Sequence, residues 1–214
     1  MQRIVAISGP DGSGKSSAAR ALVARLNLTG FESKYVWFRH RHFLSKPVLG
    51  LGRLLGFSYY VDTSEGPVGV HRYHECRPLA VALAATGTLD LLVAAWWGTL
   101  FVRRRNGPVV VVYDRWVLDA LVDLQSSTGL PLTARTIIER YSSWLQRRSG
   151  LSILVDRELP CLLGCRPDYD VDPRARDRFF LYRSIQERSG FHTVSNSGTI
   201  EELVDSMMQI VGDP

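Results

Sequence analysis

Short apolar runs alternate with longer segments of helical periodicity along most of the chain. The runs that predict strands are residues 3–8, 34–38, 109–113, 151–155 and 191–194. The third of them, VVVVY, is apolar at every position and rich in β-branched residues. A strand of this kind is typical of the middle of a parallel sheet that is covered on both faces.

The segments between these runs have apolar residues at helical spacing. Helices are predicted at 17–28, 47–57, 78–105, 117–126, 133–148, 173–188 and from Thr199 to about 211. Three glycines weaken the prediction at 47–57, and residues 62–69 are rich in turn formers. Thr199 and Glu202 form a capping box that begins the last helix. This alternation predicts an α/β fold with helices on both faces of a parallel sheet, where ligands bind beyond the carboxyl ends of the strands.

The segment 78–102 is long and apolar enough to span a membrane, with Asp90 as its one charged residue and arginines at 103–105. A span there would separate two segments that both carry phosphate chemistry, as argued below. A buried helix and no membrane span is therefore the expectation. The first eight residues are too short for a signal peptide.

Length and composition favour one soluble domain covering residues 1–214. The net charge is +5, and only three of the 26 basic residues are Lys, so arginine dominates. No long basic run indicates nucleic-acid binding, which stays possible but is not favoured. The three cysteines, an odd number, favour free thiols and a cytoplasmic location.

Residues 9–16 read GPDGSGKS and match the P-loop pattern G-x-x-x-x-G-K-[ST] in full. The motif lies between a predicted strand and a predicted helix, as a phosphate-binding loop must. Backbone N–H groups and the start of the helix then cradle the phosphates of ATP. We expect Lys15 to reach the β- and γ-phosphates and the Ser16 hydroxyl to ligate Mg²⁺. The predicted nucleotide-binding residues are Gly9, Asp11, Gly12, Ser13, Gly14, Lys15, Ser16 and Ser17.

The strand at 109–113 runs directly into Asp114, Arg115 and Trp116. An acidic residue at the carboxyl end of a central strand lies beside a P-loop. Asp114 is therefore predicted to hold Mg²⁺ or to orient the attacking oxygen, and Arg115 to meet a phosphate. The alternative is that Asp114 caps the following helix and that Arg115 pairs with it.

The chain resembles the thymidylate kinase group of nucleotide kinases. The resemblance rests on Asp11 within the P-loop, on the Asp114–Arg115–aromatic motif, and on the order of features toward the carboxyl terminus. There Asp156 ends a strand, an Arg-rich segment and a helix with Tyr182 follow, and IEEL begins the last helix. The match covers residues 1–38 and 107–211.

This resemblance implies a three-layer α/β/α P-loop kinase fold with a five-stranded parallel sheet and a lid at about residues 157–178. It places Asp11 near the acceptor and its sugar, places Arg115 near the acceptor phosphate, and implies a homodimer. Members of the family supply a catalytic arginine from the P-loop or the lid, and this P-loop has none. Lid candidates are Arg166, Arg174, Arg176 and Arg178, and the predicted catalytic set is Lys15, Asp11, Asp114, Arg115, Arg174, Arg176 and Arg178.

The middle of the chain departs from the family. Thymidylate kinases follow their second strand with Arg-Glu-Pro-Gly-Gly, where this chain has Arg-His-Arg-His at 39–42. The family's nucleotide-contacting arginine has no match near Asp90. The predicted acceptor site therefore draws on the region 39–77 and comprises Asp11, Arg39, Arg41, Arg72, Arg77 and Arg115. Asp119 and Asp123, four apart on one helix, either approach a sugar hydroxyl or face water.

Three functions are compatible with these features. The first is a kinase that moves the γ-phosphoryl group of ATP to a nucleoside monophosphate, such as dTMP or a related pyrimidine nucleotide. The second is a kinase of the same fold with another acceptor, such as a modified nucleotide, a nucleoside or a hydroxyl in DNA. The third is a nucleotide-binding regulatory protein with little turnover.

Overall fold

A computed structural model describes most of the chain. The described residues are 4–38, 42–63, 66–103, 109–164, 168–172, 174–187 and 190–212. Two of the predicted acceptor residues, Arg39 and Arg41, and the lid residue Arg166 lie outside them.

Five parallel strands form the central sheet, in the order β2-β5-β1-β6-β7. Their bounds are β1 Ile4–Ser8, β2 Ser33–Trp37, β5 Val110–Asp114, β6 Gly150–Asp156 and β7 His192–Ser195. Every residue of β1 and β5 is buried, as their continuous apolar sequence predicts. The strands end together at one edge, so the P-loop after β1 and the residues after β5 and β6 are neighbours.

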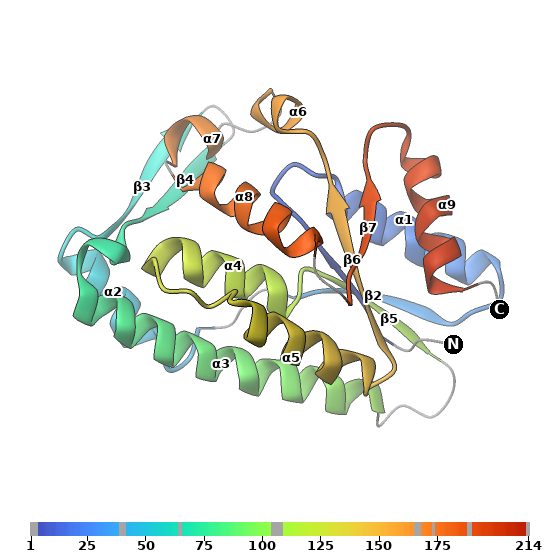
Figure 1. Cartoon of the computed structure of the whole chain (residues 1–214), viewed down its shortest axis with the longest axis horizontal. Helices are drawn as coiled ribbons and strands as arrows, with labels where there is room; N and C mark the ends of the chain where they lie inside the picture. The colour runs from blue at the N-terminus through green and yellow to red at the C-terminus, as the bar shows by residue number, and fades with distance from the viewer. Residues whose placement is uncertain are drawn as a thin grey trace.

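Helices cover both faces of this sheet, as Figure 1 shows. One face packs against α1 (Lys15–Leu28) and α9 (Ile200–Val211), with Val5, Ile7 and Met207 in the layer between. The other face packs against α3 (Arg77–Arg103), α4 (Val117–Thr128), α5 (Arg135–Gln146) and α8 (Ala175–Gln186). The predicted three-layer α/β/α fold with a five-stranded parallel sheet is therefore confirmed.

The segment after β2 differs from its prediction. Within the segment 62–69, which the sequence marks as turn-rich, residues 62–63 and 66–69 belong to the antiparallel strands β3 (Ser58–Thr63) and β4 (Gly66–His71). A helix does form before it, but α2 (Lys46–Leu54) ends three residues earlier than the apolar pattern suggests. Glycines are typical of turns, so they obscured the strand signal here. In β4, Gly69 leaves room for the side chains of His71 and Tyr60. A short 3-10 turn at Tyr73–Glu75 then leads into α3.

The helix α3 is the one helix in the described part of the chain whose length and composition would allow it to cross a membrane. Its inner side packs on α4 and the sheet, where Leu91 and Ala95 are buried. Asp90 is buried in this helix as well. Its carboxylate accepts hydrogen bonds from the N–H groups of residues 43–45 and from the Ser45 hydroxyl, and so it fixes the start of α2.

The predicted lid contains two short helices, α6 (Leu159–Leu163) and α7 (Asp168–Val171), followed by the start of α8. In Figure 1 the lid lies above the ends of the strands and beside the hairpin. The capping box at the start of α9 is present as predicted, because Glu202 N–H donates to Thr199 Oγ1 and Thr199 N–H donates to Glu202 Oε2.

Candidate active site

Glycines allow the loop after β1 to wrap closely. Gly9, Gly12 and Gly14 all have φ between 86° and 153°, in the region that side chains rarely adopt. A Cβ on Gly9 would clash with the carbonyl oxygen of Val155, and one on Gly14 with the amide of Asn196. Helix α1 begins at Lys15, so its N-terminal N–H groups point toward the loop. This is the cradle that a chain of phosphates requires.

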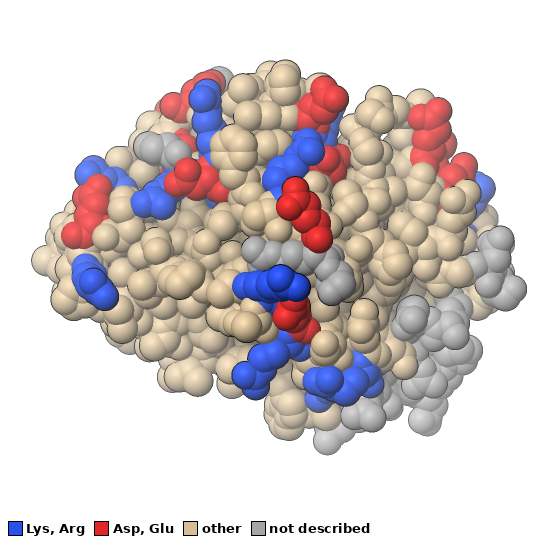
Figure 2. All heavy atoms as spheres, viewed as in Figure 1, with Lys and Arg blue, Asp and Glu red and all other residues tan. Residues whose placement is uncertain are grey.

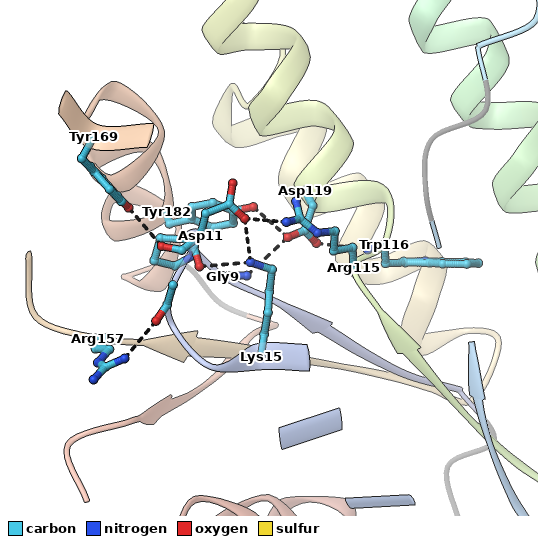
Figure 3. A network of polar contacts seen from close by, with 11 residues as sticks. Gly9, Asp11, Lys15, Arg115, Trp116, Asp119, Arg157, Tyr169 and Tyr182 are labelled. Atoms are coloured by element: carbon cyan, nitrogen blue, oxygen red, sulfur yellow. Dashed lines mark hydrogen bonds and ion pairs between the residues drawn. The ribbon is translucent and has the colours of Figure 1, made fainter. Parts of the chain in front are cut away.

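Lys15 and Arg115 meet at Asp11 inside this loop (Figure 3). Lys15 Nζ lies 3.1 Å from Asp11 Oδ1 and 3.1 Å from the carbonyl oxygen of Pro10. Arg115 donates to the same Asp11 oxygen. Burial alone would raise the pKa of Asp11, but the charges of Lys15 and Arg115 hold it well below its usual range. Asp11 is therefore an anion that holds two cations at the mouth of the phosphate loop.

Arg115 has a strained backbone. Its φ is 65°, which is unusual for a residue with a Cβ, and its N–H donates to the carbonyl oxygen of Ile7 at 3.0 Å. This conformation ends β5 abruptly and turns the guanidinium toward the P-loop. Strain of this kind is found mainly at functional sites, where surrounding structure holds it in place.

Asp114 ends β5 on the side of the sheet that faces α1. It alternates with Val110 and Val112, whose side chains belong to the layer under α1. Its Oδ2 accepts a 2.6 Å hydrogen bond from the Tyr35 hydroxyl. Its Oδ1 is buried and has no hydrogen-bond partner among the described residues. A buried oxygen without a hydrogen bond destabilises the folded protein unless a bound ion, water or ligand satisfies it.

These residues fit a magnesium ion that is bound together with ATP. Mg²⁺ usually takes one or two protein oxygens and keeps water and phosphate oxygens for the rest. The orphaned Asp114 Oδ1 and the Ser16 hydroxyl, in the first turn of α1, would supply that share. No group of three or more His, Cys, Asp or Glu side chains able to hold a metal alone occurs in the described residues. The donor set thus suits an ion that arrives with its nucleotide.

Replacing Asp114 with asparagine is expected to lower kcat for phosphoryl transfer by about 100-fold. It is also expected to raise the Mg²⁺ concentration needed for half-maximal rate, because the amide cannot replace the anionic oxygen. Magnesium titrations of the steady-state rate measure both effects. Tyr35→Phe is the matched control, since it removes the hydrogen bond to Asp114 and leaves the carboxylate. If Asp114→Asn keeps the full rate at low Mg²⁺, Asp114 has only a structural role.

Asp119 fastens the site together. It is buried in the first turn of α4, where its Oδ2 accepts from the N–H of Trp116 at 3.0 Å. Its Oδ1 accepts from the Tyr182 hydroxyl at 2.8 Å and from the N–H of Gly9 at 3.4 Å. One carboxylate therefore ties the P-loop to α4 and α8, and its position in the fold is that of a structural support.

A cleft of about 530 Å³ opens beside Asp11 and Arg115. Its walls come from the end of β2, the hairpin β3–β4, α3, α4 and the lid. Trp37, Phe38 and Trp116 supply aromatic surface, while Asp123 and Arg178 supply charge. This volume is within the range of sites that enclose small molecules. The cleft begins where the phosphate loop ends, which is where a phosphate acceptor would have to lie.

Arg178 is the lid arginine that the structure brings to this cleft. Its Nη1 lies 2.7 Å from Oδ2 of Asp172, a buried carboxylate that also accepts from the N–H of Arg174. The guanidinium lines the cleft together with Asp11, Arg115 and Asp123. Burial alone would lower the pKa of Arg178. The carboxylates of Asp123 and Asp172 raise this pKa by more than burial lowers it, so the side chain stays charged.

The other lid arginines point elsewhere. Arg174 pairs with Asp177 at 3.3 Å, and Arg176 is exposed on α8. Arg157, which directly follows β6, donates to the carbonyl oxygen of Gly12 at 3.1 Å. It braces the P-loop on the side away from Arg115, as Figure 3 shows, and it is not among the residues that line the cleft.

Asp123 lies one helical turn beyond Asp119 and faces the cleft. The residue is exposed, and it lines both the main cleft and the narrow gap beside Tyr169 and Tyr182. Loss of bulk water raises the pKa of Asp123 to about 6, although Arg178 acts in the opposite direction. Asp123 is thus ionised at neutral pH and available to accept hydrogen bonds.

The structure brings some of the predicted site residues together and not others. Asp11, Lys15, Arg115 and Arg178 converge at one end of the cleft. Arg72 pairs with Glu75, and neither Arg72 nor Arg77 is among the residues that line the cleft. Ser17 is exposed on α1, one residue beyond Ser16.

Two of three supporting residues carry no signal that the sequence alone reveals. Asp172 is one acid among several in the lid, and only its burial shows that it holds Arg178. Asn196 follows β7 and donates to the carbonyl oxygen of Ser13 at 2.7 Å. Arg157 could have been suspected, since it directly follows a strand at the ligand-binding edge of the sheet.

No protein-family model matches the chain, and no curated protein matches it. Among solved structures, it is similar to deoxyadenosine kinase from M. mycoides with bound dATP, at 11% identity and a TM-score of 0.52. That match covers 98% of this chain and 100% of the kinase. It is also similar to the YorR protein from Bacillus subtilis in complex with phosphorylated GDP, at 12% identity and a TM-score of 0.51, with 97% and 95% covered. The likeness to thymidylate kinases in particular stays a prediction, and the chain has the three-layer fold of P-loop nucleotide kinases.

Proposed function

We propose that this chain is a Mg²⁺-dependent kinase that transfers the γ-phosphoryl group of ATP to a nucleotide-sized acceptor bound in the cleft. The observation that carries the proposal is the position of Asp11. This one carboxylate belongs to the P-loop, holds Lys15, and lines the acceptor cleft together with Arg115. The phosphate cradle and the cleft therefore share a boundary, which is the arrangement an in-line transfer requires.

The named residues divide the work of that transfer. An acceptor oxygen attacks the γ-phosphorus, the bond to the β–γ bridging oxygen breaks, and ADP leaves. A hydroxyl acceptor also releases its proton to water, whereas the phosphate dianion of a monophosphate has none to release. Lys15 and the N–H groups at the start of α1 bind the phosphates, and Arg178 approaches from the cleft side. Mg²⁺, held by Ser16 and Asp114, would offset the negative charge of the phosphates. Because charge spreads over the transferring group, these fixed cations matter more in the transition state than in the ground state.

The finer proposal is a nucleoside monophosphate acceptor with a pyrimidine base, as the resemblance to thymidylate kinases implies. Arg115 and Arg178, which line the cleft, support it, because a monophosphate beside ATP needs positive charge to offset repulsion. Trp37 and Phe38 offer an apolar wall on which a base would stack. The volume of about 530 Å³ is sufficient for a nucleotide.

A specific observation favours a second candidate, an uncharged nucleoside. Four carboxylates line the described part of the cleft, namely Asp11, Asp119, Asp123 and Asp172, against the two arginines. Carboxylates accept hydrogen bonds from sugar hydroxyls and repel a phosphate. One of the similar structures is itself a deoxyadenosine kinase.

A panel of acceptors separates these candidates. ADP release is measured with Mg²⁺ and ATP in the presence of nucleoside monophosphates, nucleosides, or DNA that bears a hydroxyl group. We expect a pyrimidine monophosphate to stimulate the rate by at least about 100-fold over ATP alone, since positioning alone contributes far more than this. Stimulation by nucleosides only would replace the monophosphate proposal with the second candidate. No stimulation by any acceptor would leave a nucleotide-binding regulatory protein.

A further inference from the structure

The charged and uncharged walls of the acceptor cleft are separate. Charged side chains gather where the cleft meets the P-loop and the lid, namely Asp11, Arg115, Asp119, Asp123, Asp172 and Arg178. The rest of the described lining contains no Asp, Glu, Lys or Arg, and α3 contributes only Leu83 to it. In Figure 2 the charged side chains of the visible face likewise gather over the lid and α8, while the surface over α3 at the lower left carries few. An acceptor that fills the cleft therefore needs one charged or hydroxyl-bearing end and one uncharged end.

The hairpin β3–β4 forms the wall of the cleft that lies away from the P-loop. Pro67, Gly69 and His71 alternate along β4, so one face of this strand is turned toward the cleft. In Figure 1 the hairpin lies at the far left of the molecule, and α1, which begins at the P-loop, lies at the right. A molecule that extends from the P-loop along the cleft reaches this hairpin with its far end.

His71 supplies a hydrogen-bonding group on this face of the hairpin. Its Nδ1 lies 2.9 Å from the hydroxyl oxygen of Ser58, a buried residue that pairs with it across the two strands. This contact fixes the plane of the imidazole ring. The other ring nitrogen, Nε2, has no hydrogen-bond partner among the described residues and is not one of their buried unpaired atoms. Because His71 lines the cleft, Nε2 is open to a molecule bound there.

Gly69 keeps this nitrogen open. A Cβ at Gly69 would lie 3.3 Å from Nε2 of His71 and 3.4 Å from a ring carbon of Tyr60, which is tighter than most contacts of a Cβ. The φ of Gly69 is not positive, so the backbone there does not itself require glycine. The missing side chain therefore makes room beside the imidazole, and alanine would fill that room without straining the strand.

The imidazole of His71 is neutral at pH 7. Burial lowers its pKa below the ordinary value. The titratable and charged groups that face it are Asp172, which raises this pKa, and Arg178, His42 and Arg53, which lower it. A neutral imidazole has one donor and one acceptor, and Nδ1 already uses one of them. Nε2 therefore offers a single uncharged hydrogen bond, which fits a heteroaromatic ring better than a phosphate.

We infer that His71 recognises the pyrimidine base of the acceptor, through a hydrogen bond between its Nε2 and the edge of the base that points away from the sugar. The inference rests on the proposed function and assigns the base to the hairpin end of the cleft. Val68 of β4 and Leu83 of α3 offer apolar surface to the faces of the ring there. The reacting phosphate or hydroxyl group then lies at the other end, beside Asp11 and Arg115.

Ser127 and His42 are the competing candidates for this hydrogen bond, because both line the cleft. The Ser127 hydroxyl already donates, at 2.8 Å, to a carbonyl oxygen one turn earlier in α4. The Nδ1 of His42 lies 2.8 Å from the hydroxyl of Ser45, so this ring is held at the start of α2 and not on the hairpin. The polar atoms of Tyr73 and Trp116, which also line the cleft, are buried. His42 is therefore the alternative to test directly.

Calorimetric titrations of the whole chain test the inference without relying on turnover. The probes are thymidine, thymidine monophosphate and the N3-methyl derivative of each, added with Mg²⁺ and ADP present to fill the P-loop. We expect at least one of the two unmodified probes to bind. Its N3-methyl derivative should bind at least about tenfold more weakly, because the methyl group blocks the edge of the base that meets His71. Failure of both unmodified probes to bind, or equal binding of the methylated one, overturns the inference.

Two variants locate the contact. His71→Phe keeps a ring of similar size and removes both nitrogens, and it should weaken binding of the unmodified probe by about tenfold, since the base is left with an unpaired polar group. Gly69→Ala leaves the imidazole in place and puts a methyl group beside Nε2, so it should weaken the same binding by at least about threefold. It also keeps the inference testable if His71→Phe does not fold, which thermal melting shows.

His192→Phe is the matched control, because His192 is exposed on β7 and is not among the residues that line the cleft. It should bind the probes as the wild-type chain does. Unchanged affinity in folded His71→Phe and Gly69→Ala overturns the inference. A loss that appears in His42→Phe and not in His71→Phe overturns it as well and assigns the base to His42.

Turnover separates this inference from the proposed function. In the active enzyme His71→Phe should raise the KM for the acceptor by about tenfold and change kcat much less, because His71 lies away from the reacting group. Normal transfer with an unchanged acceptor KM in this variant would overturn the role of His71 and leave the kinase assignment standing. Binding that depends on His71, without transfer to any acceptor, would sustain the role of His71 and overturn the proposed transfer.

Discussion

Replacing Lys15 with alanine is expected to lower kcat for phosphoryl transfer by at least about 1,000-fold, with little change in the fold. Lys15 is buried at the start of α1, and its ammonium group lies 3.1 Å from Asp11 and from the Pro10 carbonyl oxygen. In the proposed complex with ATP, this side chain would contact the β- and γ-phosphates. A loss of about 1,000-fold corresponds to about 4 kcal/mol of transition-state stabilisation.

The steady-state rate of ADP release and the thermal melting temperature should be measured on the same preparation. Asp11 keeps Arg115 as its ionic partner in the variant, so the loss of Lys15 does not leave a buried charge without compensation. Lys15→Met retains most of the side-chain volume and should be equally inactive. Lys34→Ala removes an exposed lysine that pairs only with Glu32, and it should keep the full rate. A folded Lys15→Ala protein with normal turnover would remove the P-loop from the mechanism.

The second large effect is expected at Arg178, the arginine that Asp172 holds at the edge of the cleft. Arg178→Ala should lower kcat by about 1,000-fold and change the KM for ATP much less, because the guanidinium meets charge that develops during transfer. Arg176, two residues earlier on the same helix, is exposed and makes the matched control. Arg176→Ala should stay within about threefold of the wild-type rate.

Asp172→Asn provides an independent check on Arg178. The amide still accepts the hydrogen bond from the Arg174 N–H but no longer pairs ionically with Arg178. A partial fall in kcat is expected, since the guanidinium remains but loses its anchor. If Arg178→Ala keeps its rate while Arg174→Ala or Arg176→Ala loses it, the lid must rearrange on binding ATP, and the observed contact of Arg178 is not the functional one.

The parts of the fold that local sequence determines were predictable. Local sequence alone is sufficient to predict the apolar strands β1 and β5, the Gly-rich loop and the capping box of α9. The P-loop places Lys15 and Ser16 without any knowledge of the rest of the chain. Asp114 and Arg115 follow from one further rule, that parallel strands end at the same edge of the sheet.

Features that depend on distant contacts were not predictable. The hairpin β3–β4 contains two glycines and a proline and lacks a clear alternation, so its turn residues dominate the local pattern. The role of Asp90 depends on a segment 45 residues away, and Asp119 makes a bond 63 residues away to Tyr182. The choice of Arg178 among the lid arginines depends on the burial of Asp172. Each of these depends on contacts that no local periodicity encodes.

The most direct test of the central claim follows the γ-phosphoryl group itself. The wild-type chain is incubated with Mg²⁺, ATP labelled at the γ-position, and a mixture of pyrimidine nucleosides and nucleoside monophosphates, and the products are separated. We predict that label moves into a phosphorylated acceptor in step with ADP formation, that chelation of Mg²⁺ stops it, and that Lys15→Ala shows none. Label that stays in ATP, or that appears only as inorganic phosphate with every acceptor present, would contradict the assignment of this site as a kinase.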